Sequence, residues 1–116
     1  MIVLNYRDPR PLYEQVRDGL RRLIETGGIA DGEKLPSVRQ LAGSLAINPN
    51  TIQRAYNELE AQGYAVSVPG KGSFAVYNTR HLEQKLEQLR TLVRELRACG
   101  VSQQEIEALC REGENE

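Results

Sequence analysis

The chain has 116 residues, of which 40% are hydrophobic and 27% are charged, and its formal net charge at pH 7 is −1. This length suits one compact domain with an appendage rather than two full domains, and the composition is ordinary for a globular protein. No stretch approaches the roughly 18 consecutive apolar residues that a membrane span needs, and the N-terminus lacks the apolar segment of a signal peptide, so we expect a cytoplasmic protein without a membrane partner.

The first ten residues predict a short extended segment. In this segment Ile2 and Leu4 alternate with Val3 and Asn5. Such alternation is typical of a β-strand, or of an arm that packs on the domain or on a partner.

A helix is predicted from Pro11 to about Thr26, because proline suits the first helical turn and apolar residues follow at helical spacing. The apolar residues are Leu12, Val16, Leu20, Leu23 and Ile24. The pair Gly27–Gly28 ends the helix. Residues 31–36 then predict a turn followed by a very short strand that stops at Pro36.

A second, shorter helix opens at Ser37, which is a good N-cap residue. Its apolar residues, which we expect to face inward, are Val38, Leu41, Ala42 and Leu45. Residues 46–48 join it to the next helix, and so tight a link sets two helices at a steep angle. Ile47 precedes the next cap, so we expect it to pack near Ile52 as a hydrophobic staple.

The third helix is predicted from Asn48 to Gly63. Asn48 can cap the first turn, Pro49 loses no hydrogen bond at the first helical position, and Gly63 provides a C-terminal stop. One face is apolar and consists of Ile52, Ala55, Tyr56 and Leu59. The opposite face carries side chains that can bind base edges and phosphates, namely Asn50, Gln53, Arg54 and Asn57. Taken alone, such a helix is more often simply amphipathic with a solvated polar face. The elements before and after it in the chain therefore determine whether this polar face is interpreted as a DNA-binding surface.

After Gly63 the apolar period changes from 3.6 to 2. Residues 64–68 and 73–77 predict two strands, and the turn Pro69–Gly72 places glycines where a hairpin needs positive φ. The order is therefore helix, short strand, helix, tight turn, helix and hairpin. This order indicates a winged helix-turn-helix, an α+β fold that is mostly α, over residues 1–77.

Residues 78–116 predict a short tail of two helices. Five apolar residues follow a heptad spacing, with Leu92 widening the stripe: Leu82, Leu86, Leu89, Val93 and Leu96. A capping box at residues 102–105 opens the last helix, whose inward residues are expected to be Ile106, Leu109 and Cys110. We interpret Cys99 and Cys110 as small buried hydrophobic residues rather than a redox pair. The heptad stripe could pack back on its own domain, but we favour dimerisation, because the tail is too short to fold alone.

Four ordered motifs over roughly residues 10–77 resemble the GntR family of bacterial transcription regulators. They are PLYEQV at 11–16, LPSVRQLA at 35–42, the helix from Asn48, and the wing VPGKGSF at 68–74. The sequence NPNT at 48–51, the RAY that follows at 54–56 and the short helical tail are similar to the YtrA-type branch of the family. The resemblance implies a homodimeric regulator, usually a repressor, that binds a palindromic double-stranded DNA operator.

The resemblance also implies DNA contacts at particular residues. Arg39 would hold a phosphate or reach a base, and Gly70 and Lys71 match the wing tip that enters the minor groove. The positions at the front of the recognition helix, which spans Pro49–Gln62, meet bases and backbone in the major groove: Asn48, Asn50, Thr51 and Gln53. Many members have an arginine where this chain has Pro49, so we expect base reading to shift to Asn50, Gln53 and Arg54.

The chemistry of these residues agrees with this interpretation. Asn and Gln amides suit adenine, with roughly 1–3 kcal/mol of discrimination for each bidentate pair, and the amides of a helix N-terminus attract phosphate. Residues 1–80 hold ten Lys and Arg against eight Asp and Glu, whereas residues 81–116 hold five against eight. The basic excess therefore lies in the part that would bind DNA.

Two other classes of function compete with DNA binding. A winged-helix module for protein–protein assembly would more often expose aromatic or aliphatic residues than arginines and lysines. An enzyme is not expected, because His81 is the only histidine and has no evident nucleophile or paired carboxylate nearby in the sequence. We expect no cofactor and no metal, since Cys99 and Cys110 lack matching ligands. The sequence leaves open whether a small-molecule effector binds, because no residue cluster indicates a pocket for one.

Overall fold

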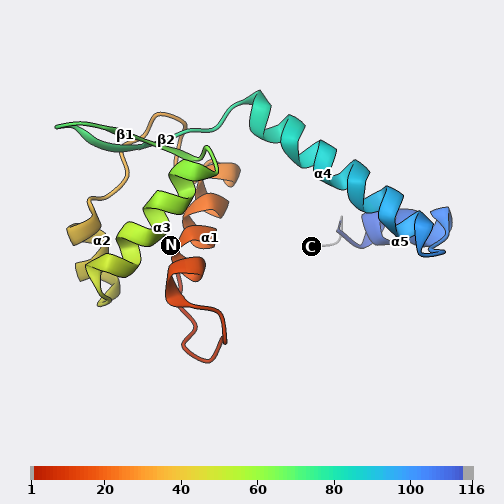
Figure 1. The fold of residues 1–116 in the computed structure, drawn as a ribbon, viewed down its shortest axis with the longest axis horizontal. Coiled ribbons are helices and arrows are strands. Elements are labelled where there is room, and N and C mark those ends of the chain that lie inside the picture. The colour runs from red at the N-terminus through yellow and green to blue at the C-terminus, as the bar shows by residue number, and fades with distance from the viewer. Residues whose placement is uncertain (1, 114–116) are drawn as a thin grey trace. The chain divides into compact units, whose positions relative to one another are not determined.

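The computed structural model describes residues 2–113, which contain five helices and one two-stranded antiparallel sheet (Figure 1). The elements are α1 (Leu12–Thr26), α2 (Val38–Leu45), α3 (Pro49–Ala61), β1 (Ala65–Val68), β2 (Gly72–Ala75), α4 (Thr79–Ala98) and α5 (Gln103–Gly113). The chain divides between Asn78 and Thr79 into two compact units, which are described separately below. The predicted α+β class with mostly helical content is confirmed. Within residues 2–113 no helix is both long and apolar enough to span a membrane.

The first unit is built around a core shared by α1, α2, α3 and the hairpin. Its largest fully buried side chains are Val16, Leu20, Ile24, Ile52 and Leu59. Full burial of such a side chain stabilises the fold by about 1.5–3 kcal/mol relative to exposure. Figure 1 shows the three helices gathered together, with the hairpin at the C-terminal end of α3. The apolar stripes predicted for the three helices are thus the surfaces that meet.

The segment before α1 is an arm that folds back on its own unit. Ile2 and Leu4 pack against the core, and none of residues 2–10 is in a strand. The buried Gln15 holds this arm, because its Oε1 accepts from the backbone N of Asn5 at 2.8 Å and its Nε2 donates to the carbonyl of Asn5 at 3.1 Å. Pro11 is the N-cap residue rather than the first helical residue, which corrects the expected start of α1 by one position.

The turn between α2 and α3 is short and uses an unusual backbone conformation. Ser37 caps α2, and with Gln40 it forms a reciprocal capping box. Ala46 ends α2 in the left-handed region at φ 55° and ψ 45°. Its neighbour Ile47 donates from its backbone N to the carbonyl of Ala42 at 3.1 Å and packs against the core. This pattern closes the last turn of α2 and sends the chain directly into α3.

The hairpin follows α3 after Gly63, whose φ of 83° marks the predicted helix stop. Strand β1 pairs with β2 in the register Val66 to Phe74 and Val68 to Gly72, so both strands are shorter than predicted. The amide of Lys71 donates to the carbonyl of Val68 at 2.9 Å, and Gly70 between them has φ 75°. Proline followed by a glycine of positive φ inside such a turn is the pattern of a type II turn.

The predicted strand before Pro36 is a single bridge rather than a strand. Lys34 bridges to Phe74, and the amide of Leu35 donates to the carbonyl of Ser73 at 2.8 Å. The reason is local, because Pro36 cannot donate to a longer ladder and α2 is capped immediately afterwards by Ser37. The bridge nevertheless ties the second strand of the hairpin to the segment that leads into α2.

The second unit consists of α4 and α5. Gly100 ends α4 at φ 90°, and the Oγ of Ser102 accepts from the amide of Glu105 at 3.2 Å, so the predicted stop and cap are present. The expectation that Leu109 and Cys110 face inward is wrong, because Leu109 is 56% exposed and Cys110 is an exposed free thiol. Cys99 is also exposed and free, which corrects its assignment as a buried residue. Periodicity correctly marked an apolar face, but within this unit nothing covers these residues.

Candidate nucleic-acid interface

The polar face of α3 is open to solvent along the first two turns and beyond. Asn50, Gln53 and Arg54 are exposed, while Thr51 is half-buried. The other face of the helix holds Ile52, Ala55, Tyr56 and Leu59, which are all buried in the core. The sequence folds in this way because the apolar residues recur at three- and four-residue spacing. The side chains predicted to meet DNA therefore lie together on one uncovered surface, except for the partly covered Thr51.

The N-terminus of α3 is closed by its own cap. The Oδ1 of Asn48 accepts from the amide of Asn50 at 2.8 Å, and the carbonyl of Asn48 accepts from the amide of Thr51 at 3.0 Å. Pro49 has no N–H to offer. Both amides that follow the proline are occupied, so this terminus has less capacity to hold a phosphate than the sequence indicated. The groups that this end of α3 still presents are its side chains.

Two hydrogen-bonding side chains of α3 are held in different directions. The Nε2 of Gln53 donates to the Oδ1 of Asn57 at 2.9 Å along the exposed face. The guanidinium of Arg54 instead lies over the ring of Tyr13 in α1, 3.7 Å from its centroid, and its Nε is 3.8 Å from Glu58. A cation this close to an aromatic face is attracted by the ring. Gln53 thus stays with the polar face, while Arg54 is drawn toward α1.

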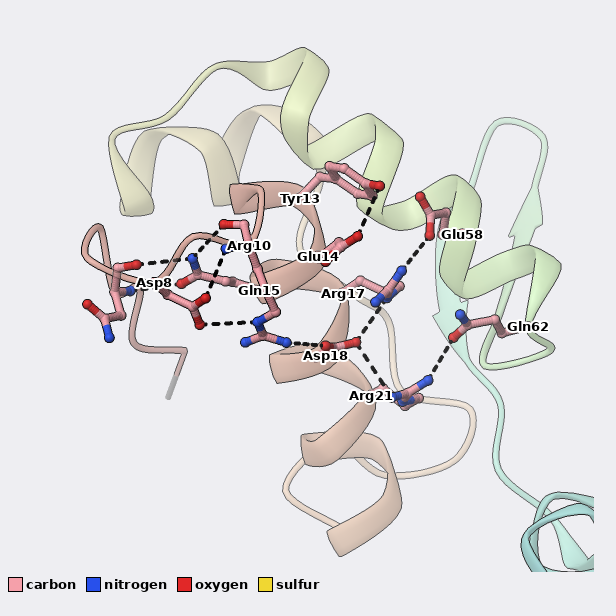
Figure 2. A network of polar contacts seen from close by, with 11 residues as sticks. Asp8, Arg10, Tyr13, Glu14, Gln15, Arg17, Asp18, Arg21, Glu58 and Gln62 are labelled. Atoms are coloured by element: carbon pink, nitrogen blue, oxygen red, sulfur yellow. Dashed lines mark hydrogen bonds and ion pairs between the residues drawn. The ribbon is translucent and has the colours of Figure 1, made fainter. Parts of the chain in front are cut away.

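A network of charged groups joins the start of α1 to α3 (Figure 2). Arg17 donates to Glu58 at 2.6 Å and to Asp18 at 2.9 Å, and Arg10 reaches the same Asp18 at 2.9 Å. Partial burial opposes the charged form of Asp18, but the hydrogen bond from Arg17 and the nearby guanidinium groups outweigh it. They hold the pKa of this carboxyl below its usual value. The network fixes α3 against α1 from the side that does not carry Gln53.

The start of α2 is tied to α3 by Tyr56. Its hydroxyl donates to the carbonyl of Pro36 at 2.6 Å, and burial raises the pKa of Tyr56 to about 12, so the hydroxyl stays protonated at neutral pH. Arg39 lies in the first turn of α2 and is exposed. The tie and the capping box together fix the N-terminal end of α2, where Arg39 lies.

The wing tip is exposed, and no other part of the described structure crowds it. Gly70 and Lys71 are both exposed, and a Cβ built on Gly70 would meet no atom within 4 Å. Gly72 is more restricted, because its φ is 117° and a Cβ there would lie 3.0 Å from the side chain of Lys34. The tip therefore presents one lysine on a narrow backbone, while the base of the wing is closely packed.

The second unit exposes an apolar stripe along α4. Leu82, Leu86 and Leu89 are 53%, 43% and 51% exposed, and Leu92 beside them is 54% exposed. Val93 and Leu96, the last two residues of the predicted heptad pattern, are half-buried. An unbroken row of exposed leucines is unusual for a helix in water.

Sequence reasoning missed two features of the first unit. The first is the contact of Arg54 with Tyr13, which belongs to another helix, so the periodicity of α3 does not mark it. Glu58, by contrast, lies at the i,i+4 spacing from Arg54 that a helix brings together. A groove of about 730 Å³ in the first unit was also not foreseen, because its lining comes from several separate segments and includes Ile2, Leu23, Leu35 and Gln40. No group of metal-ligating side chains occurs within residues 2–113.

Three packed helices, a tight turn before an uncovered polar helix, and a hairpin define the first unit as a winged helix-turn-helix DNA-binding domain. A family model described as bacterial regulatory proteins, gntR family, matches residues 12–75. The chain belongs to this GntR family, and it is a transcriptional regulator with a DNA-binding domain.

Similar proteins include one with a known role and two with solved structures. The HTH-type transcriptional repressor YtrA of Bacillus subtilis (strain 168) is 35% identical over 118 residues, which cover 97% of this chain and 91% of YtrA. A GntR family transcriptional regulator from Listeria monocytogenes superposes with a TM-score of 0.68 at 35% identity, over 90% of this chain and 96% of its own. The DBD of AraR in complex with operator ORR3 superposes with a TM-score of 0.57 at 30% identity, over 64% of this chain and 89% of its own.

Proposed function

We propose that the protein is a homodimeric transcriptional repressor that acts in the cytoplasm on a palindromic operator. In each protomer α3 enters the major groove, and the wing tip at Gly70 and Lys71 enters the adjacent minor groove. The other contacts come from Arg39 of α2, from the N-cap residue Asn48, and from four residues of α3: Asn50, Thr51, Gln53 and Arg54. The observation that carries the proposal is the uncovered row of amide side chains on α3, a helix whose other face is fully used by the core.

The comparisons support two parts of this proposal. YtrA of Bacillus subtilis, which is similar over nearly the whole chain, is a repressor, and the AraR domain that shares the fold of the first unit binds an operator. Helix-turn-helix proteins read bases with the N-terminal part of their second helix, which here is α3.

The exposed stripe of α4 supports the dimer. Each of its four leucines leaves about half of its surface in water, so burial against a second copy would contribute about 1 kcal/mol per leucine. Heptad spacing is the pattern by which two helices bury such a stripe in each other. A two-fold dimer also matches a palindromic DNA site, with half-sites roughly one helical turn apart.

The main test is selection of bound sequences from a random duplex library with the full chain, followed by affinity measurements at physiological salt. We expect an inverted repeat with half-sites centred roughly 10 base pairs apart. Lys71→Ala should weaken binding to the selected and to random DNA alike and reduce the salt slope by about one unit, whereas Lys85→Ala in α4 should not. If the dimer selects no DNA sequence, the proposal of operator binding is refuted, and a winged-helix module for protein–protein assembly is favoured instead.

The dimer is tested separately by sedimentation. The double variant Leu86→Lys/Leu89→Lys should sediment as a monomer, because two charges would have to be buried in the stripe. The matched control is Gln84→Lys/Thr91→Lys, which adds the same charges on the side of α4 away from Leu86 and Leu89. If both variants remain dimers, the stripe is not the dimer interface.

A further inference from the structure

The hydrogen bond between Gln53 and Asn57 determines which groups Gln53 can offer to a base. A free glutamine amide can present its oxygen or its nitrogen in either direction. Here Nε2 of Gln53 already donates to Oδ1 of Asn57 at 2.9 Å, and the two residues lie one turn apart on the exposed face of α3. The bond leaves Gln53 with its Oε1 acceptor and its second N–H donor available.

This pair of groups matches only one kind of base edge in the major groove. Adenine presents an N6 donor beside an N7 acceptor, so it can pair with Oε1 and with the remaining N–H at once. Guanine presents two acceptors, O6 and N7, and Oε1 would face O6 without a proton between them. The arrangement therefore favours adenine over guanine.

Other polar side chains of α3 are less available for this role. Asn48 uses its side-chain oxygen as the helix cap. Arg54 lies over Tyr13 and beside Glu58, on the side of the helix that faces α1. Asn50 remains exposed on the same face as Gln53, and it provides a natural comparison because it makes no hydrogen bond to Gln53 in the structure.

We propose that Asn57 is a positioning residue that fixes the amide of Gln53 for adenine, so that the pair reads one A·T base pair in each half-site. The inference rests on the proposed function, because it assigns a role within the operator contact. Asn57 acts through Gln53, and its own substitution should matter only while Gln53 is present.

The test uses the operator selected by the wild-type chain, with each base pair of one half-site replaced in turn. We expect Gln53→Ala to abolish the preference for A·T over G·C at one position, where the wild type discriminates by about tenfold or more. Asn57→Ala should reduce the preference at that same position to about threefold or less. In the double variant Gln53→Ala/Asn57→Ala, the second substitution should have no further effect on that preference.

Two matched variants separate positioning from a general effect on structure or charge. Asn57→Asp keeps an oxygen that can only accept, so it should retain the adenine preference within about twofold while its negative charge weakens binding to all DNA. Asn50→Ala should leave the preference at the Gln53 position unchanged. Thermal melts of all variants should match the wild type closely, because both side chains are exposed.

The outcomes distinguish the two proposals. A wild-type chain that selects no operator overturns the proposed function and this inference together. A wild-type chain that selects an operator, with Asn57→Ala keeping the full preference or Asn57→Asp losing it, overturns this inference alone. A preference for G·C at the Gln53 position would also overturn it.

Discussion

Ala46→Gly should stabilise the protein, because Ala46 is the one non-glycine residue with positive φ among residues 2–113. At φ 55° and ψ 45° its Cβ crowds the following carbonyl, which costs about 1–2 kcal/mol for a residue other than glycine. Alanine is exposed here, so its removal loses little apolar burial. Glycine also makes the unfolded chain more flexible, which offsets about 0.4–1 kcal/mol of the gain. The net increase in the free energy of unfolding should be about 0.5–1 kcal/mol.

Urea unfolding followed by circular dichroism measures this change, at one fixed protein concentration so that any dimer contributes equally. Gly27→Ala is the matched control, because Gly27 ends α1 at φ 85° and a Cβ there would meet no atom within 4 Å. It should lower the free energy of unfolding by a similar amount. If Ala46→Gly also lowers stability, chain flexibility outweighs backbone strain at this turn, and the reasoning is refuted.

Two further perturbations test contacts that hold the helices around the turn. Tyr56→Phe should keep the ring packing but remove the 2.6 Å hydrogen bond to the carbonyl of Pro36. In urea titrations the free energy of unfolding should fall by about 1–2 kcal/mol. An unchanged unfolding midpoint would mean that this hydrogen bond makes no net contribution to stability. Asp18→Asn should reduce stability at pH 7, and this loss should shrink as the pH falls into the acid range. The lowered pKa of Asp18 means that its carboxylate stabilises the fold above about pH 4, and this contribution is lost as the pH falls through the folded-state pKa. Thermal melts of both proteins across this range should converge in acid; a constant gap would contradict the assignment.

The helices and turns of the first unit could be predicted because their ends carry local chemical signals. Ser37 and Asn48 are caps whose side chains bond to amides two or three residues away, as the structure shows. Gly63 and Gly70 occupy backbone conformations that glycine adopts most easily. These features depend on a few neighbouring residues, so the sequence contains them directly.

The direction of individual side chains could not be predicted. The position of Arg54 depends on Tyr13, which belongs to another helix, and nothing in the spacing of α3 marks that contact. The prediction of which residues are buried in α5 was wrong for a different reason. Helical periodicity showed that Leu109 lies on an apolar face, but a periodicity does not say whether another element covers that face. The amphipathic pattern of α3 thus predicted the exposure of Asn50 and Gln53, while the direction of each side chain became visible only in the structure.

The hydrogen bonds between residues 32–35 and the second hairpin strand have a consequence for how such a regulator can diversify. Glu33 and Leu35 bond to Ala75 and Ser73, so the base of the wing belongs to the same framework as α2. Pro69, Gly70 and Lys71 lie beyond this framework and are exposed. Substitution of the exposed Lys71 is therefore nearly neutral for folding, so selection can act on this lysine without changing the scaffold, whereas replacing Gly70 at φ 75° would strain the backbone. An engineer could exchange Lys71 for the corresponding residue of another wing while leaving the scaffold intact.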